Sequence, residues 1–195
     1  ARHPDACAHR LPLTHYDPLP RCVNLILFES TELDAPLPRR DPRAVHIIDV
    51  LRRSAGGTFD AGVINGARGK GTLVRVGDNA LTLNFVWGNP PPPPFPITLI
   101  VGLPRPQTAR DILRDATTLG VEAMHFVTTD RCDPNYARSN LWSGGEWRRL
   151  LITGAQQAFC TRLPVVMSGH SLSDTLATLP PTGIRFALDN YESPI

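Results

Sequence analysis

Residues 89–101 read NPPPPPFPITLIV, and the pattern of the sequence changes at this stretch. The first eight residues, 89–96, form a proline run that favours polyproline II, an extended conformation that acts as a stiff spacer. A ligand for a proline-binding domain is the other interpretation of such a run. The mostly apolar residues 97–101 that follow predict a buried parallel strand. We therefore expect a linker at residues 89–96 and a domain boundary there.

Helical and strand patterns alternate after the proline run. Apolar residues at helical spacing and short apolar runs predict helices at 109–119, 147–158 and 172–179, and further strands at 123–128 and 184–188. This order predicts an α/β domain over residues 97–195, with a parallel sheet and right-handed crossovers. Residues 168–171, Ser-Gly-His-Ser, are expected to form a polar turn at a helix entry.

Short strands and one helix are predicted before the proline run. The strands are expected at residues 23–28, 58–64, 72–76 and 81–87, with a hairpin loop marked by Asn65-Gly66 and by residues 69–71. Asp41 and Pro42 are expected at the N-cap and first turn of a helix that ends before Gly56-Gly57. This set predicts a small β-barrel over residues 23–88. Residues 1–22 are proline-rich and aperiodic, which predicts a disordered extension.

Basic side chains concentrate between residues 39 and 75. This segment holds eight Arg or Lys and three Asp, a balance of +5, so the rest of the chain carries −3 of the total net charge of +2. A basic segment beside a mildly acidic one suggests a surface that faces a polyanion such as nucleic acid. A solvated arginine-rich surface is the alternative.

Five basic residues are candidates for contact with a phosphate backbone. The candidates are Arg43, His46, Arg52, Arg68 and Lys70. The first three would project from neighbouring helical turns, and the last two from a hairpin tip. Guanidinium groups bind phosphate oxygens in a bidentate manner. The alternative for Arg52 is a surface ion pair with Asp49.

Other kinds of site lack support in the sequence. The turn after residues 97–101 contains two prolines, which removes the N–H donors that a phosphate-binding loop needs. The four cysteines match no zinc-ligand spacing, and reduced thiols in a cytoplasm are the simpler interpretation. The histidines are dispersed, and His125 is expected to be a hydrogen-bonded core residue. No apolar run is long enough to span a membrane.

Several motifs, in their order along the chain, resemble one enzyme family. The segment from Arg43 to Arg52 resembles the signature H-x-x-x-V-L-R of the small-subunit (16S) ribosomal RNA uridine-N3 methyltransferases, which belong to the SPOUT class. Leu119-Gly120-Val121 resembles the family's E-L-G-V. Gln157, Arg162 and Pro164 resemble its E-Q-x-x-R-x-x-V-P segment. The resemblance covers residues 23–190.

The resemblance implies a PUA-like RNA-binding barrel followed by a partial SPOUT methyltransferase domain. It implies S-adenosyl-L-methionine as methyl donor, 16S rRNA or the small ribosomal subunit as partner, and a homodimer for the full-length protein. The family's G-P-E-G-G loop and knot segment are absent, so we expect the chain to stop before most of the donor site. Leu188, Asp189 and Asn190 are then expected to rim the donor pocket, while the catalytic base is not identified. The competing hypotheses are a non-catalytic RNA-binding protein and an unrelated doubly wound enzyme.

Overall fold

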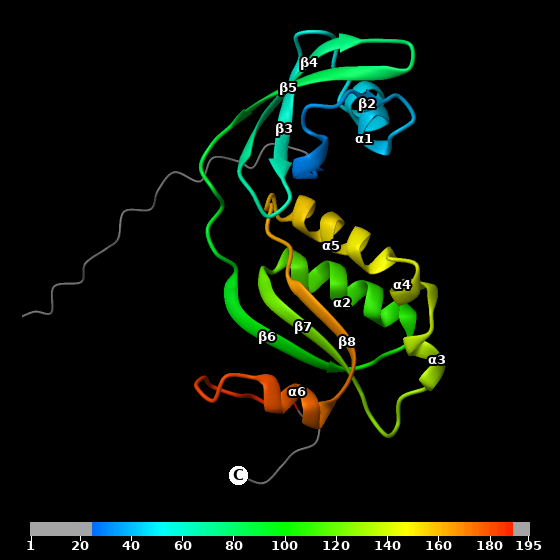
Figure 1. The fold of residues 1–195 in the computed structure, drawn as a ribbon, viewed down its shortest axis with the longest axis vertical. Helices are drawn as coiled ribbons and strands as arrows, with labels where there is room; N and C mark the ends of the chain where they lie inside the picture. Colours follow the sequence, from blue (N-terminus) through cyan, green and yellow to red (C-terminus); the bar gives the residue numbers. More distant parts are fainter. Residues whose placement is uncertain (1–24, 189–195) are drawn as a thin grey trace, which may run out of the picture.

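The computed structural model describes residues 25–188 and contains two sheets, one on each side of the proline run (Figure 1). The first sheet has the order β1-β3-β4-β5-β2, and the second has three parallel strands in the order β6-β7-β8. The strands of the first sheet are β1 (Ile26–Phe28), β2 (Leu37–Pro38), β3 (Thr58–Val63), β4 (Arg68–Val76) and β5 (Ala80–Trp87). Those of the second are β6 (Phe95–Gly102), β7 (Val121–Thr128) and β8 (Val165–Ser171).

An antiparallel meander, β3-β4-β5, forms the centre of the first sheet. β1 joins β3 in parallel, and β2 pairs with only the start of β5, through Leu37 opposite Leu81. β4 begins at Arg68, so residues 69–71 lie within a strand and the prediction of a hairpin loop there was wrong. The prediction of a turn at Asn65-Gly66 is confirmed: Asn65 has a left-handed φ of +59°, and the Gly66 N–H donates to the Val63 carbonyl.

A short helical segment packs against this sheet. α1 (Pro42–Val45) follows the predicted start, because the Asp41 carboxylate accepts the Arg43 N–H at 2.8 Å and Pro42 occupies the first turn. The helix then widens into a π-helix, η2 (His46–Val50). A 3-10 turn, η1 (Ser30–Glu32), lies between β1 and β2.

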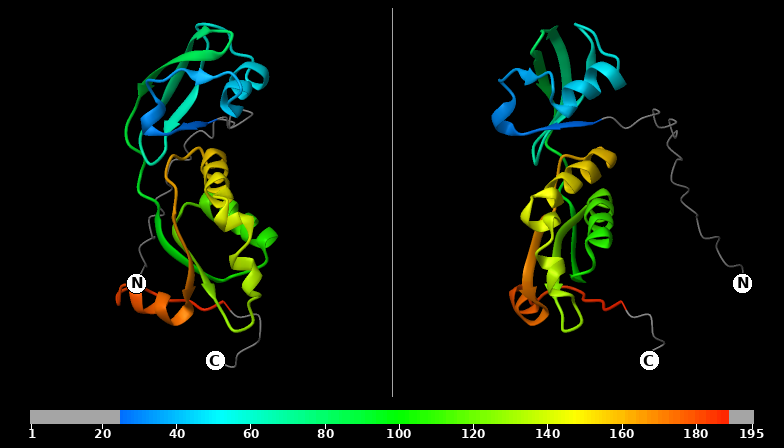
Figure 2. Two further views of the ribbon diagram at one scale, coloured as in Figure 1. Left: turned by 45° about the vertical axis from the view of Figure 1, so that its right-hand side comes forward. Right: turned by 90° about the vertical axis from the view of Figure 1, so that its right-hand side faces the viewer.

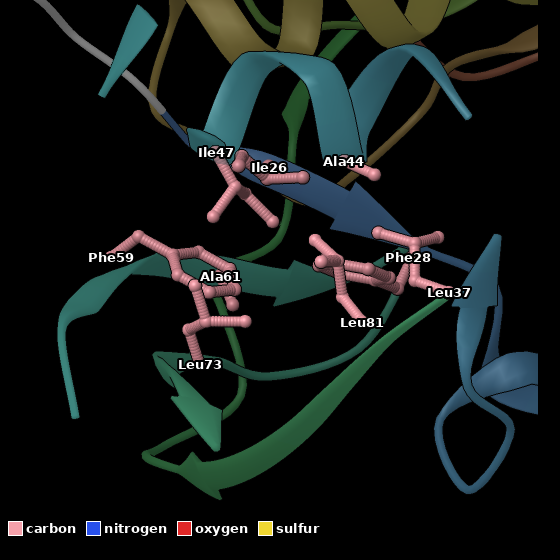
Figure 3. Packing of buried hydrophobic residues seen from close by; sticks show 9 residues of the cluster. All are labelled: Ile26, Phe28, Leu37, Ala44, Ile47, Phe59, Ala61, Leu73 and Leu81. Atoms are coloured by element: carbon pink, nitrogen blue, oxygen red, sulfur yellow. The ribbon is translucent and has the colours of Figure 1, made fainter. Parts of the chain in front are cut away.

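The sheet curls around an apolar core (Figure 3). Side chains from alternate positions of the strands point inward, where they meet the helical segment. The buried members are Ile26, Phe28, Leu37, Ala44, Ile47, Phe59, Ala61, Leu73 and Leu81. Within residues 25–188 no strand pairing joins β1 to β2, so the hydrogen bonding that is described leaves an open, curled sheet. The prediction that the chain has mixed α and β structure is confirmed.

Two long helices cover one face of the second sheet (Figure 2). The helices after the proline run are α2 (Pro106–Thr118), α3 (Pro134–Ala137), α4 (Asn140–Ser143), α5 (Glu146–Gln157) and α6 (Leu172–Thr178). α2 and α5 approach closely at Gly154, where a Cβ would lie 2.3 Å from the Arg114 carbonyl oxygen. The predicted helical faces are largely confirmed, since Ala109, Leu113 and Leu151 are buried.

The third strand of the second sheet lies elsewhere than predicted. It is β8, Val165–Ser171, which pairs in parallel with β7. The prediction of a strand at residues 184–188 was wrong: this segment has no regular structure, and Ile184 and Phe186 are each 85% exposed. The predicted polar turn at residues 168–171 is the end of β8, although Ser171 does cap the helix entry by accepting the Asp174 N–H.

The β3–β4 turn and the loop after α5 hold the two parts together. The Asn65 N–H donates to the Thr161 carbonyl at 2.7 Å, and the Thr161 hydroxyl donates to the Gly66 carbonyl at 2.6 Å. A Cβ on Gly62 would lie 2.5 Å from Cγ2 of Thr161, so only glycine fits there. Leu25, Leu27 and Ala155 form a small apolar cluster nearby. Among the described residues, no helix has the length and apolar character needed to cross a bilayer.

Candidate functional site

Arg43 lies at the centre of a half-buried charged cluster. Its Nε and Nη2 donate to the Asp41 carboxylate at 3.0 and 2.8 Å, and Nη2 also donates to Glu32 Oε2 at 3.0 Å. Nη1 bonds Glu32 Oε1 and donates to the Leu27 carbonyl oxygen at 3.3 Å. The guanidinium carbon also lies 4.9 Å from the centre of the Phe28 ring. All five N–H groups of the guanidinium are therefore engaged.

The protonation behaviour of this cluster follows from these bonds. Hydrogen bonds from Arg43 lower the pKa of the Glu32 and Asp41 carboxyl groups, although burial opposes the shift. The Asp41 carboxylate in turn raises the pKa of Arg43. An RNA phosphate could bind Arg43 only by displacing a carboxylate. The structure thus corrects the expectation that Arg43 projects freely towards a partner: it joins η1 and α1 to β1.

His46 and Arg52 lie along and just after the π-helix. His46 is half-buried, whereas Arg52 is exposed. Arg52 has a φ of +52°, and the N–H of the next residue, Arg53, donates to the Ile47 carbonyl. This left-handed position at a helix end is usually occupied by glycine. An arginine there is strained, which is a feature often found at functional positions.

Arg68 and Lys70 lie on β4, on the outer face of the curled sheet. Lys70 forms a cross-strand ion pair with Asp60 at 2.7 Å. Arg68 donates to the Phe159 carbonyl oxygen at 2.9 Å and lies over the Phe159 ring, 5.2 Å from its centre. Inward-facing Leu73 marks the opposite side of the same strand. Arg68 therefore contributes to the contact between the two parts of the molecule.

The five predicted phosphate-binding residues do not form one cluster. Arg68 and Lys70 share the outer face of β4, while His46 and Arg52 belong to the helical segment on the inner side. Arg43 is engaged by carboxylates. Of the five, Arg52 and Arg68 are exposed and have no ion pair among residues 25–188, but Arg68 already donates to the Phe159 carbonyl. A partner that touched all of them would have to wrap around the edge of the sheet.

The carboxyl ends of the parallel strands form a second candidate site. β6, β7 and β8 end at the same edge of the sheet, where ligands of open α/β folds bind (Figure 1). Thr128 donates through its hydroxyl to the His170 carbonyl at 3.2 Å, and Gly169 has a φ of +90°. Among the described residues, no group of three His, Cys, Asp or Glu side chains could hold a metal ion there or elsewhere.

His125 lies inside the second sheet, next to this edge. It is 7% exposed, which confirms the predicted burial, whereas the predicted side-chain hydrogen bond is not seen among residues 25–188. Burial lowers its pKa, and the neighbouring His170 adds a smaller effect in the same direction. His125 is therefore favoured in its neutral form.

The structure describes only one of the three residues that were predicted to rim the donor pocket. Asp189 and Asn190 lie outside the described residues. Leu188 is described, but it is 97% exposed and belongs to no strand, so its expected place at a strand end was wrong. The reason is that the sequence pattern at 184–188 is strand-like, whereas no strand pairs with it among residues 25–188.

Two hollows in the first part of the molecule were not predicted. One, of about 330 Å³, lies beside Phe28 and the Arg43 cluster. The other, of about 310 Å³, lies between the chain after η1 and the end of β5, against Phe85 and Trp87. The alternation of apolar residues along β5 was a signal that these rings share a face. It could not show that part of this face stays open.

Comparisons with known proteins show similarity in both sequence and fold. A family model described as an RNA methyltransferase domain matches residues 91–194. A curated relative, the ribosomal RNA small subunit methyltransferase E of Treponema pallidum (strain Nichols), is 36% identical over 154 residues, which are 77% of this chain and 58% of that protein. The chain thus spans little more than half the length of that relative.

Solved structures show the same fold. A probable rRNA-methyltransferase from Porphyromonas gingivalis superposes with a TM-score of 0.64 at 18% identity, over 79% of this chain and 64% of that one. A ribosomal RNA small subunit methyltransferase E from Neisseria gonorrhoeae, bound to S-adenosyl methionine, gives a TM-score of 0.60 at 20% identity, over 80% and 66%.

Proposed function

Because the chain belongs to the RNA methyltransferase family, whose domain matches residues 91–194, we propose that the protein methylates small-subunit ribosomal RNA. The reaction is transfer of a methyl group from S-adenosyl-L-methionine to N3 of a uridine in 16S rRNA. The observation that carries the substrate is the 36% identity to a ribosomal RNA small subunit methyltransferase. The solved neighbour with bound S-adenosyl methionine supports the donor. The proposed ribosomal substrate supports a cytoplasmic location as part of the same proposal.

In this proposal the first sheet belongs to an RNA-binding domain and the second to the methyltransferase domain. Residues 23–88 are a PUA-like RNA-binding barrel, residues 89–96 are the linker, and residues 97–195 are part of a SPOUT methyltransferase domain. The curled sheet with its own core supports the first assignment, and the parallel sheet covered by α2 and α5 supports the last. The knot segment that would complete the donor site, and the contact that would form a homodimer, are proposed to lie outside these 195 residues.

The chemistry requires alignment more than side-chain reactivity. S-adenosyl-L-methionine, when bound, would supply a methyl group on a sulfonium: the methyl–sulfur bond would break as N3 forms the new C–N bond, the sulfur would leave as a neutral thioether, and the N3 proton would pass to a base or to solvent. The protein contributes by holding the two reactants in line and by excluding water. The described part of the donor site is the edge at Thr128 and Gly169, where the positive φ and missing side chain of Gly169 leave the backbone accessible. Asp189 and Asn190 are kept as proposed rim residues.

Arg52 is proposed as the main RNA contact. His46, on the π-helix that precedes Arg52, and Lys70, on the outer face of β4, are proposed as further contacts. Arg52 is exposed and carries its charge on a backbone conformation that glycine would adopt more easily. Arg68 supports the RNA-binding part by fixing it to the loop at Phe159. Arg43 is proposed to act indirectly, because its ion pairs hold the helical segment that contains His46 and precedes Arg52.

Calorimetry with S-adenosyl-L-methionine tests the proposal. We expect a protein that extends past Ile195 into the knot segment to bind the donor, and residues 1–195 alone to give no heat of binding. Donor binding by neither chain would contradict the methyltransferase assignment and favour a non-catalytic RNA-binding protein. Sedimentation of the two chains tests the dimer, because we expect the longer chain alone to form it.

A further inference from the structure

Three aromatic rings form a row that begins with Phe28 in the core of the first sheet, continues with Phe85 and ends with Trp87 at the end of β5. The Phe28 and Phe85 rings meet edge to face, with centroids 4.9 Å apart. The Phe85 and Trp87 rings are stacked, with centroids 5.0 Å apart and an angle of 12° between their planes. Phe85 and Trp87 are only half-buried. The row therefore ends in ring surface that the described residues leave accessible.

A hollow lies against the end of this row. It measures about 310 Å³ and is lined by Leu33, Asp34, Leu83, Asn84, Phe85 and Trp87. Pockets for small ligands begin at about 300 Å³, so this hollow is suited to one planar group rather than to a large ligand. Leu33 and Leu83 lie beside the rings in its lining.

One polar group with unused bonding capacity, the Asp34 carboxylate, also lines this hollow. Asn84 alternates with Phe85 along β5, so its side chain lies on the face opposite the rings, where Oδ1 accepts the Phe85 N–H. The Asp34 carboxylate is exposed and has no hydrogen bond or ion pair among residues 25–188. β2 pairs with β5 only at Ala80 and Leu81, so the rest of this β5 edge has no partner strand in that part of the chain.

We propose that this hollow binds one unpaired RNA base, stacked on the Trp87 ring at the end of the row. A base offers a flat π-face to the ring, and its edge carries N–H donors that the Asp34 carboxylate can accept. The Asp34 carboxylate, which has no ion pair among residues 25–188, repels phosphate and so favours entry of the neutral base over the charged backbone. This inference rests on the proposed function, because it supposes that the bound polymer is RNA.

Trp87→Leu tests the stacking in the chain of residues 1–195. The probe is a fluorescently labelled, unstructured ten-nucleotide RNA, with affinity read from anisotropy at constant salt. Loss of a stacked base weakens binding by about 5- to 100-fold. We expect Trp87→Phe to retain most of the affinity, because the ring is kept. Val86→Ala is the matched control, since Val86 is 68% exposed on the opposite face of the same strand.

An abasic oligonucleotide separates stacking from phosphate contact. We expect Trp87→Leu to leave the weak affinity for this probe unchanged, whereas a general loss of structure would lower it as well. Asp34→Asn is a second variant, on an exposed loop, that should reduce affinity for the normal RNA relative to the abasic probe, because it removes a base acceptor together with a charge that repels both probes. If wild-type protein binds RNA and none of these changes affects the normal oligonucleotide selectively, the base site is refuted and the rings merely close the core. If wild-type protein binds no RNA, the proposed function fails with it.

Discussion

Replacing Arg43 by Met should destabilise the fold without removing a direct phosphate contact. Arg43 donates to two carboxylates and one carbonyl, and the three charged side chains are 19–31% exposed. A hydrogen bond to a charged group contributes about 1.5–3 kcal/mol when buried, and less when solvent screens it. Because the variant leaves two half-buried carboxylates without their cation, we expect it to lose about 2–4 kcal/mol in total.

The loss should depend on pH in a defined direction. The pKa values of Glu32 and Asp41 are lowered in the folded state, from ordinary values of 4.5 and 3.8. Their contribution is therefore present above these values and is lost as pH falls through the folded pKa. In Arg43→Met the same carboxylates no longer gain a partner. The gap in unfolding free energy between wild type and variant should be full at pH 7 and should shrink below about pH 4.

Urea unfolding at several pH values, followed by circular dichroism, measures this gap. Urea is used because a salt denaturant would screen the ion pairs. Arg40→Met is the control, since Arg40 is exposed and has no ion pair among the described residues. The reasoning is refuted if Arg43→Met unfolds within about 0.5 kcal/mol of wild type at pH 7, the range of an ordinary surface substitution, while RNA affinity and its salt slope fall.

Three further changes test other parts of the account. Arg52→Gly should raise the free energy of unfolding by up to about 1 kcal/mol, because glycine accepts the φ of +52°. The same variant should weaken RNA binding and lower the slope of log affinity against log salt by about one unit. A slope unchanged from wild type would exclude Arg52 from the interface. Gly154→Ala should lower unfolding free energy by about 1–3 kcal/mol, because the new Cβ would meet the Arg114 carbonyl at 2.3 Å, whereas exposed Gln157→Ala on the same helix should not. The pKa of His125 is lowered in the folded state, so this side chain binds fewer protons in the folded than in the unfolded protein. The free energy of unfolding should therefore fall as pH drops below 6.5, the ordinary pKa of histidine. In His125→Met the free energy of unfolding should depend less on pH over that range.

Local patterns predicted most of the regular structure. The start of α1 was found from Asp41 and Pro42, because a cap depends on neighbours in sequence. β8 was missed because its second half, Ser-Gly-His-Ser, has little strand propensity and is held by pairing with β7. The opposite error occurred at residues 184–188, where strand-like residues have no partner strand among those described.

The candidate site was harder to predict, because charge alone does not reveal tertiary pairing. Arg43 and Arg52 look alike in the sequence, yet one is enclosed by carboxylates and the other is exposed. Asp41, two residues away, was a local hint of the first pair, but Glu32 comes from a separate turn. Arg68 reaches Phe159, 91 residues away, which no local pattern could indicate.

Nucleoside mass spectrometry tests the central claim most directly. The full-length protein is incubated with small-subunit ribosomal RNA and S-adenosyl-L-methionine that carries an isotopically labelled methyl group, and the RNA is digested to nucleosides. We expect the label in 3-methyluridine and in no other nucleoside. Label in a different nucleoside would contradict the uridine-N3 assignment, and unlabelled RNA under conditions where the protein binds both RNA and donor would contradict the proposed methyl transfer.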